Sequence, residues 1–92
     1  MANGYIGSAN LETSVANAEI VPAAPAGWIN TAYHFYKYEF LNDQDCHVLI
    51  NGDSTGIFLR ANQGFKVDKD DKLITSFKIV QAGITYNWLG VF

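Results

Sequence analysis

Three groups of side chains in this sequence have types and spacings that could support chemistry. In the first group, Asp43, Asp45 and His47 are two residues apart, and residues two apart on a strand share a face. A carboxylate placed this way can orient an imidazole for acid–base catalysis. No serine or cysteine nucleophile in a recognisable turn accompanies them, and both aspartates fall in an expected loop. We therefore do not expect this protein to be an enzyme.

The second group is the acidic loop Asp-Lys-Asp-Asp at residues 68–71. Carboxylates are the ligands that calcium prefers, but the loop lacks the length, the glycine and the distal glutamate of a helix-loop-helix site. Cys46 is the only cysteine, and His34 and His47 are the only histidines, so one chain supplies neither a spaced zinc ligand set nor an internal disulfide. We expect a solvated loop, a packed cysteine, and no metal or other cofactor.

The third group is aromatic and could stack on the apolar faces of sugars, with an amide nearby to bind hydroxyls. At strand spacing, such residues more commonly form a core and an interface. We expect packing, and a glycan-binding surface remains the alternative. The group consists of Trp28, Tyr33, Tyr36, Tyr38, Tyr86 and Trp88, with Asn87.

The composition of the chain changes before these aromatic strands begin. The first 36 residues contain no lysine or arginine and only two glutamates. Pro22 and Pro25 favour an extended or turning hinge, because each proline fixes φ and donates no hydrogen bond. We expect an N-terminal arm at residues 1–27 and a β domain at residues 28–92. Within the arm, residues 11–20 are compatible with a short helix.

After the hinge, short apolar runs recur about every ten residues, which is typical of antiparallel β proteins. The predicted class is all-β, a small antiparallel β-sandwich or barrel with an extended N-terminal arm. In the first run, His34, Tyr36, Tyr38 and Phe40 are expected to face a core or a partner. The turn at residues 51–56, Asn-Gly-Asp-Ser-Thr-Gly, is the strongest hairpin signal. The expected strands are 33–40, 47–51, 57–61, 65–67, 73–80 and 84–92.

Charge and length exclude several classes of partner. The net charge is −3 and the six basic residues are scattered, whereas phosphate binding needs a concentrated basic surface, so no nucleic acid is expected. No run approaches the roughly 20 apolar residues that span a bilayer, and no secretory signal is expected at the start. A chain this small often gains stability through assembly. We therefore expect a homo-oligomer made in the cytoplasm.

Residues 56–92 also carry a resemblance to a known class of protein. The segments Gly-Ile-Phe-Leu-Arg-Ala-Asn-Gln-Gly-Phe, Ile-Thr-Ser-Phe-Lys-Ile-Val and Gly-Ile-Thr-Tyr-Asn-Trp-Leu-Gly-Val-Phe follow one another. This order is similar to the C-terminal part of small virion proteins of tailed bacteriophages. The resemblance implies a capsid decoration, head-fibre or tail-associated protein that is oligomeric and often trimeric. Its location would be the virion, assembled in the host cytoplasm, and its partners would be its own copies and a phage capsid or tail protein.

The weakly charged arm leads to a similar expectation without the resemblance, because it suits strand addition or arm exchange between neighbouring subunits. We expect residues 2–26 to make more contacts between subunits than within their own chain. Two alternatives remain: a carbohydrate- or host-surface-binding module, and a phage-encoded inhibitor of a host protein. The expected interface residues are Ile6, Leu11, Val15, Ile20, Val21, Trp28, Tyr36, Tyr38 and Trp88.

Overall fold

The computed structural model describes residues 4–28 and 33–92 of the chain. These residues contain eight strands and no helix, which confirms the all-β prediction. In particular, they include no apolar helix long enough to cross a membrane. Ala2 and residues 29–32, which the predicted arm and β domain include, lie outside the described residues. The strands are β1 (Tyr5–Gly7), β2 (Glu12–Thr13), β3 (Lys37–Asn42), β4 (Cys46–Ile50), β5 (Ile57–Leu59), β6 (Phe65–Val67), β7 (Phe77–Ile79) and β8 (Thr85–Val91).

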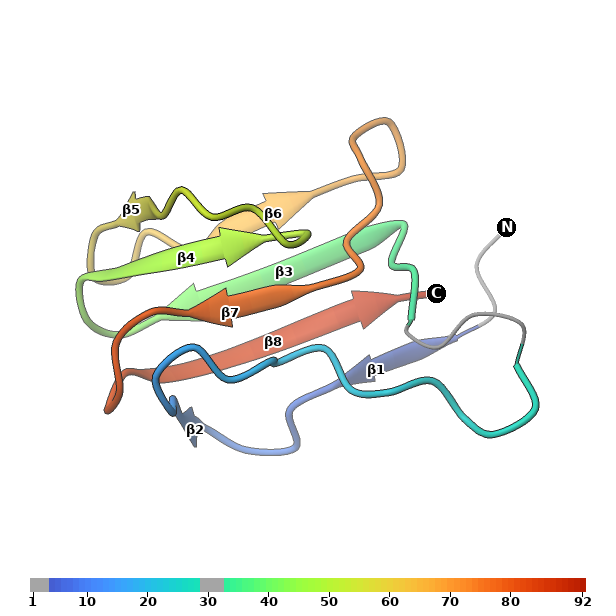
Figure 1. Ribbon diagram of the computed structural model, residues 1–92, viewed down its shortest axis with the longest axis horizontal. Coiled ribbons are helices and arrows are strands. Elements are labelled where there is room, and N and C mark those ends of the chain that lie inside the picture. The colour runs from blue at the N-terminus through green and yellow to red at the C-terminus, as the bar shows by residue number, and fades with distance from the viewer. Residues whose placement is uncertain (1–3, 29–32) are drawn as a thin grey trace.

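The strands form two antiparallel sheets that face each other as a sandwich (Figure 1). The larger sheet has five strands in the order β1-β8-β3-β6, and β2 also pairs with β8. The smaller sheet has three strands in the order β5-β4-β7. The predicted hairpin is confirmed, since β4 and β5 pair antiparallel on either side of the turn at residues 51–56. Asn51 and Gly52 of this turn have φ of 53° and 81°, which asparagine and glycine tolerate.

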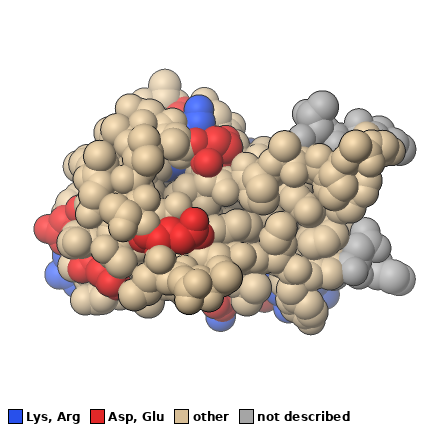
Figure 2. Space-filling model, turned by 90° about the horizontal axis from the view of Figure 1, so that it is seen from below, with Lys and Arg blue, Asp and Glu red and all other residues tan. Residues whose placement is uncertain are grey.

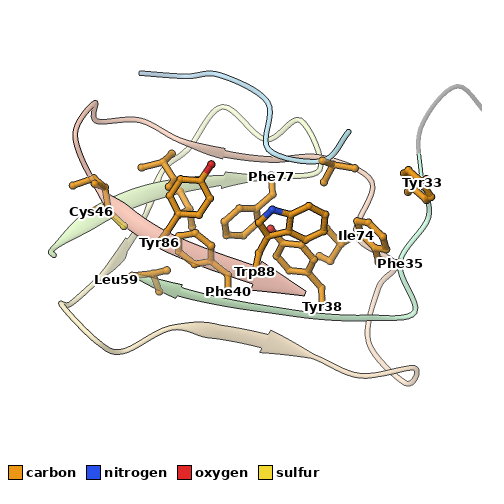
Figure 3. Close-up of a cluster of buried hydrophobic side chains, with 14 residues drawn as sticks. Tyr33, Phe35, Tyr38, Phe40, Cys46, Leu59, Ile74, Phe77, Tyr86 and Trp88 are labelled. Atoms are coloured by element: carbon orange, nitrogen blue, oxygen red, sulfur yellow. The ribbon is translucent and has the colours of Figure 1, made fainter. Parts of the chain in front are cut away.

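The core lies between the sheets and is built mainly from aromatic rings (Figure 3). Along β8, which lies within the predicted strand 84–92, Tyr86, Trp88 and Gly90 alternate inward. Tyr38 on β3 lies 5.0 Å, centroid to centroid, from Phe77 on β7, so the two sheets contact each other through these rings. Rings with offset or tilted geometry at this spacing attract each other, and this attraction adds to the stabilisation from the apolar area that they bury.

Gly90 is necessary for this packing because its inner side is occupied by Phe35. A Cβ at position 90 would lie 2.6 Å from ring carbons of Phe35, which is fully buried. Phe35 is held there by a two-way backbone bridge: its N–H donates to the Ile74 carbonyl at 2.9 Å, and the Ile74 N–H donates back at 3.0 Å. The bridge joins the segment before β3 to the segment before β7.

The predicted alternation over residues 33–40 is wrong in its first half. The chain bends at Tyr36, and the regular strand β3 begins only at Lys37. Before the bend, Phe35 is buried and His34 is exposed, whereas after it Tyr38 is buried. The bend therefore changes which residues face inward, and period-two reasoning does not carry across it.

The predicted helix over residues 11–20 is also wrong. Glu12–Thr13 instead forms β2, and Asn17 has a left-handed φ of 58°. The backbone groups of this segment bond to the body: the Ser14 N–H donates to Ile84 at 2.8 Å, and the Asn17 N–H donates to Ile79 at 2.8 Å. These tertiary hydrogen bonds outweigh the moderate helix propensity of the segment.

A buried asparagine closes one end of the sandwich and leads to the first prediction. Asn42 is fully buried, and its amide donates to the carbonyls of Gln44 (2.8 Å) and Arg60 (2.9 Å) while accepting from the Gly64 N–H (3.0 Å). Replacing it leaves these backbone groups without their partner, so Asn42→Ala should lower the free energy of unfolding by about 2–4 kcal/mol. Urea unfolding measures this. The control is Asn87→Ala at an exposed site, and equal losses in both variants would contradict the prediction.

Tyr38 leads to the second prediction, because no described residue hydrogen-bonds its buried hydroxyl. Burial, and then Tyr86 and Glu19, raise the pKa of Tyr38 well above its usual value of 10.0. Tyr38→Phe removes an unpaired polar group, so stability should stay equal or rise by about 1–2 kcal/mol near pH 8. Above about pH 10 the unfolded wild type releases a proton that the folded state retains, which lowers wild-type stability further.

Urea unfolding of wild type and Tyr38→Phe near pH 8 and near pH 11 measures this difference, since all other tyrosines are common to both proteins. We expect the gap in favour of the phenylalanine variant to widen at the higher pH. A gap that is constant with pH would show that the hydroxyl titrates alike in the folded and unfolded states, which contradicts its burial. A variant less stable than wild type at both values would show that the hydroxyl has a hydrogen-bond partner in the folded protein.

Candidate interaction surface

The structure does not bring Asp43, Asp45 and His47 together as an acid–base group. The Asp45 carboxylate accepts the backbone N–H of Ala61 at 2.7 Å and so holds the turn after β5. Nδ1 of His47 lies 3.0 Å from Nε2 of Gln81, and no carboxylate of the described residues bonds to this ring. The histidine is therefore positioned by an amide, without the carboxylate that the catalytic hypothesis requires.

The acidic loop at residues 68–71 uses its carboxylates on its own backbone. Asp68 accepts the N–H of Lys69 at 2.6 Å, and Asp71 accepts the N–H of Asp68 at 2.9 Å. Lys37 lies 3.8 Å from Asp68 across the surface. Among the described residues, no group of three or more histidine, cysteine, aspartate or glutamate side chains could hold a metal ion. The loop is thus held as a turn by its own side chains.

Cys46 is buried at the start of β4. Burial and the neighbouring Asp45 raise the pKa of its thiol, and a hydrogen bond with Asn42 lowers it to a smaller extent. Because the thiolate is the reactive form, a raised pKa leaves this cysteine poorly nucleophilic at neutral pH. It packs in the core beside Leu59, with which it is paired in register.

Most of the aromatic residues considered as a sugar platform lie in the core. Tyr33, Tyr38, Tyr86 and Trp88 are all less than a tenth exposed, and Tyr36 is half-buried. Trp28 alone of this set is substantially open, at 45%. Its ring lies against Tyr33 and Phe92, with centroids 5.3 and 5.6 Å away. The geometry therefore gives less support to glycan stacking than to packing.

The residues expected at a subunit interface divide into three groups. Val21, Tyr38 and Trp88 lie in the core, where no partner reaches them while the chain keeps this fold. Ile6 and Ile20 are partly buried and pack against the core, and Tyr36 is half-buried. The third group is exposed and comprises Leu11, Val15 and Trp28. The expectation of contacts between subunits stays a prediction, and the third group has the side chains most accessible to a partner.

The described part of the arm, residues 4–28, lies along one side of the sandwich (Figure 1). Ser8 and Ser14 fasten it. The Ser8 hydroxyl accepts the Trp88 N–H at 3.0 Å, and the buried Ser14 hydroxyl donates to Gln81 at 2.7 Å while accepting the Ile84 N–H at 2.9 Å. Further along, the Ile20 N–H donates to Phe77 at 2.9 Å. The arm thus pairs first with β8 and then with β7.

We call the solvent-exposed side of residues 4–28 the arm surface. Its large apolar side chains are Tyr5, Leu11, Val15 and Trp28, which are 78%, 64%, 68% and 45% exposed. Glu12 and Glu19 are the only charged residues in this stretch. Figure 2 shows the molecule from this side, which is uncharged over most of its extent. Large apolar side chains that stay exposed on a weakly charged surface are available for contact with another protein.

Comparison with known proteins provides no identification. No protein-family model, no curated protein and no solved structure matches this chain. The arm surface is therefore the basis for a functional proposal.

Sequence reasoning missed several exposed apolar residues of the strands. Leu41 and Leu89 point outward from β3 and β8, at 42% and 43% exposure. They line a hollow of about 340 Å³ on the outer face of the larger sheet, together with Gln63 and Asn87. Phe58 on β5 is also half exposed. The period-two pattern of β8 could have predicted that Leu89 faces outward, because it lies between the inward-facing Trp88 and Gly90.

Gly7 leads to the third prediction, because β1 approaches β8 closely at this residue. A Cβ at position 7 would collide with the Trp88 carbonyl oxygen. Gly7→Val should therefore release β1 while the sandwich stays folded, since β1 contributes only three residues. We expect amide exchange at residues 5–8 to accelerate at least about tenfold.

Hydrogen–deuterium exchange with β3 and β4 as internal references measures this effect. Ala9→Val is the matched control, because it adds the same side chain at an exposed position of the same segment. Unchanged protection of residues 5–8 in Gly7→Val would contradict the close approach of β1 to Trp88.

Proposed function

We propose that this chain is a structural protein of a tailed-phage virion, a homo-oligomer that decorates or cements the capsid or associates with a fibre. It is assembled in the host cytoplasm and attaches through the arm surface to a neighbouring subunit or to a capsid or tail protein. The resemblance over residues 56–92 supports the class of protein. The arm surface is the observation that carries the proposal, because it keeps large apolar groups in water although the arm itself is seated on the body.

The physical argument rests on what those side chains gain on contact. Leu11 and Val15 are each more than 60% exposed, and full burial of such a side chain contributes about 1.5–3 kcal/mol before ordering costs. Because the arm is already hydrogen-bonded to β8 and β7, a partner that covers it orders few additional residues. A pre-formed apolar surface of this kind suits stable attachment to a large assembly.

The fourth prediction tests attachment on particles purified from a host that carries the gene. Wild-type protein should remain on the particle after washing in high salt, because apolar contacts are insensitive to ionic strength. The particle occupancy of the double variant Leu11→Asp with Val15→Asp should be at least about tenfold lower than that of wild type, since each aspartate must be desolvated on contact. Quantitative mass spectrometry of the particles measures both.

Leu41→Asp is the matched control, because Leu41 is exposed at 42% on the outer face of the larger sheet. Its occupancy should equal that of wild type. Absence of the wild-type protein from purified particles would overturn the proposal. Retention of one host protein in a pull-down, with no particle component, would favour the inhibitor alternative instead.

A further inference from the structure

The sheets of this sandwich have edges that are protected to different degrees. The edge of β7 is covered by the arm, whose residues Asn17 and Ile20 donate backbone hydrogen bonds to Ile79 and Phe77. The edge strand β6 carries Lys66, which pairs with Glu39 at 3.5 Å. Charged edge residues and covering segments are the usual means of preventing strands from pairing with other chains.

The strand β5 has neither form of protection. It lies at the edge of the smaller sheet and consists of Ile57, Phe58 and Leu59, without a charge or a proline. Ile57 is 48% exposed and Phe58 is 50% exposed. In Figure 1 this strand lies on the side of the sandwich away from the arm. An uncharged, apolar and uncovered edge is the form most prone to add another strand.

The backbone of Phe58 is turned toward this open side. Its partner in register is His47 on β4. The His47 N–H donates to Gln81 at 2.8 Å, and the His47 carbonyl accepts the Val80 N–H at 2.9 Å, so both groups point away from β5. His47 and Phe58 are therefore the non-hydrogen-bonded pair of the ladder, and the N–H and C=O of Phe58 face outward.

Charges around β5 indicate which strand would fit. Asp53 and Arg60 are the only charged residues between positions 51 and 64. Neither makes an ion pair with any other described residue. If two copies pair antiparallel, Arg60 at the end of one β5 strand lies near the turn of the other copy that contains Asp53. If they pair parallel, like charges lie together. The edge is thus self-complementary in the antiparallel sense.

We propose that β5 is a contact between two copies of this chain, paired antiparallel about Phe58 on a two-fold axis. The two Phe58 residues exchange N–H···O=C hydrogen bonds, and Ile57 of each copy lies opposite Leu59 of the other. Ile57 also borders a hollow of about 330 Å³, which Phe65 and Val67 help to line together with polar residues such as Asn51 and Lys72. The added strand covers Ile57 at the border of this hollow.

The inference rests on the proposed function only in its premise that the protein assembles with copies of itself. A two-fold contact of this kind is isologous and by itself closes a dimer. It lies on the other side of the sandwich from the arm surface. One molecule can therefore bind its copy through β5 and a particle protein through the arm surface at the same time.

The fifth prediction compares Phe58→Lys with Leu89→Lys by sedimentation velocity over a series of protein concentrations. Leu89 is the matched control, because it is 43% exposed but lies on a strand paired on both sides. Wild type and Leu89→Lys should dimerise alike. Phe58→Lys should raise the dissociation constant at least about tenfold, because two ammonium groups would face each other across the axis.

A cysteine at the axis provides an independent readout. Opposed residues of a hydrogen-bonded antiparallel pair have Cα atoms about 5.5 Å apart, within the range of a disulfide. With oxidised glutathione, Phe58→Cys should form a covalent dimer, whereas Leu89→Cys and wild type with its buried Cys46 should not. Asp53→Arg alone should weaken dimerisation, and adding Arg60→Asp should restore it, because the second change re-creates opposite charges across the axis.

Each other outcome overturns the inference and bears separately on the proposed function. A wild-type oligomer that Phe58→Lys leaves intact, a trimer included, removes β5 as the contact while self-assembly stands. A wild type that is monomeric at every concentration removes the contact between copies, and particle occupancy then decides the structural role independently. If wild type is monomeric and Phe58→Lys has a lower particle occupancy than wild type, a strand of another protein pairs with β5.

Discussion

The backbone hydrogen bonds between the arm and strands β7 and β8 are the constraint on which the rest of the structure depends. A small sandwich has sheet edges, and each unpaired edge exposes polar backbone groups. Here the N–H groups of Ser14, Asn17 and Ile20 fill three of those positions in turn. The same path places Val21 in the core, at 4% exposure. The described part of the arm is therefore joined to the sandwich, and what it offers a partner is its outer surface.

The inner face of β8 and the class of the fold were predictable because they depend on local patterns. Tyr86, Trp88 and Gly90 follow period two without interruption, and the turn at residues 51–56 contains residues that accept positive φ. The bend at Tyr36 was not predictable in this way, because it follows from the fit of Phe35 against Gly90, some 55 residues away in sequence. The pairing of residues 11–20 with β8 and β7 likewise depends on distant partners.

Several short polar side chains, the candidate Asp45 among them, have a common structural use in this fold. Asp45 and Asn42 bond to the backbone of the turn after β5, and Asn51 bonds to the backbone of the stretch before β7. A side chain that closes a turn must be short and polar, which are also the features of many catalytic and metal-binding residues. Sequence spacing does not distinguish these two uses, because they differ in what the side chain contacts in the folded chain.

The two sides of the sandwich differ in a way that follows from chain direction. The arm precedes the body and closes the side formed by β7 and β8, using the chain's own residues. The opposite side, formed by β5 and β6, has no such segment among the described residues, and its edge strand β5 keeps Ile57 and Phe58 in water. Adding a further strand to the smaller sheet would only move the edge, since any open sheet ends in an edge strand. Pairing with a second copy would cover it without any additional segment, and the outward N–H and C=O of Phe58 are oriented for that pairing.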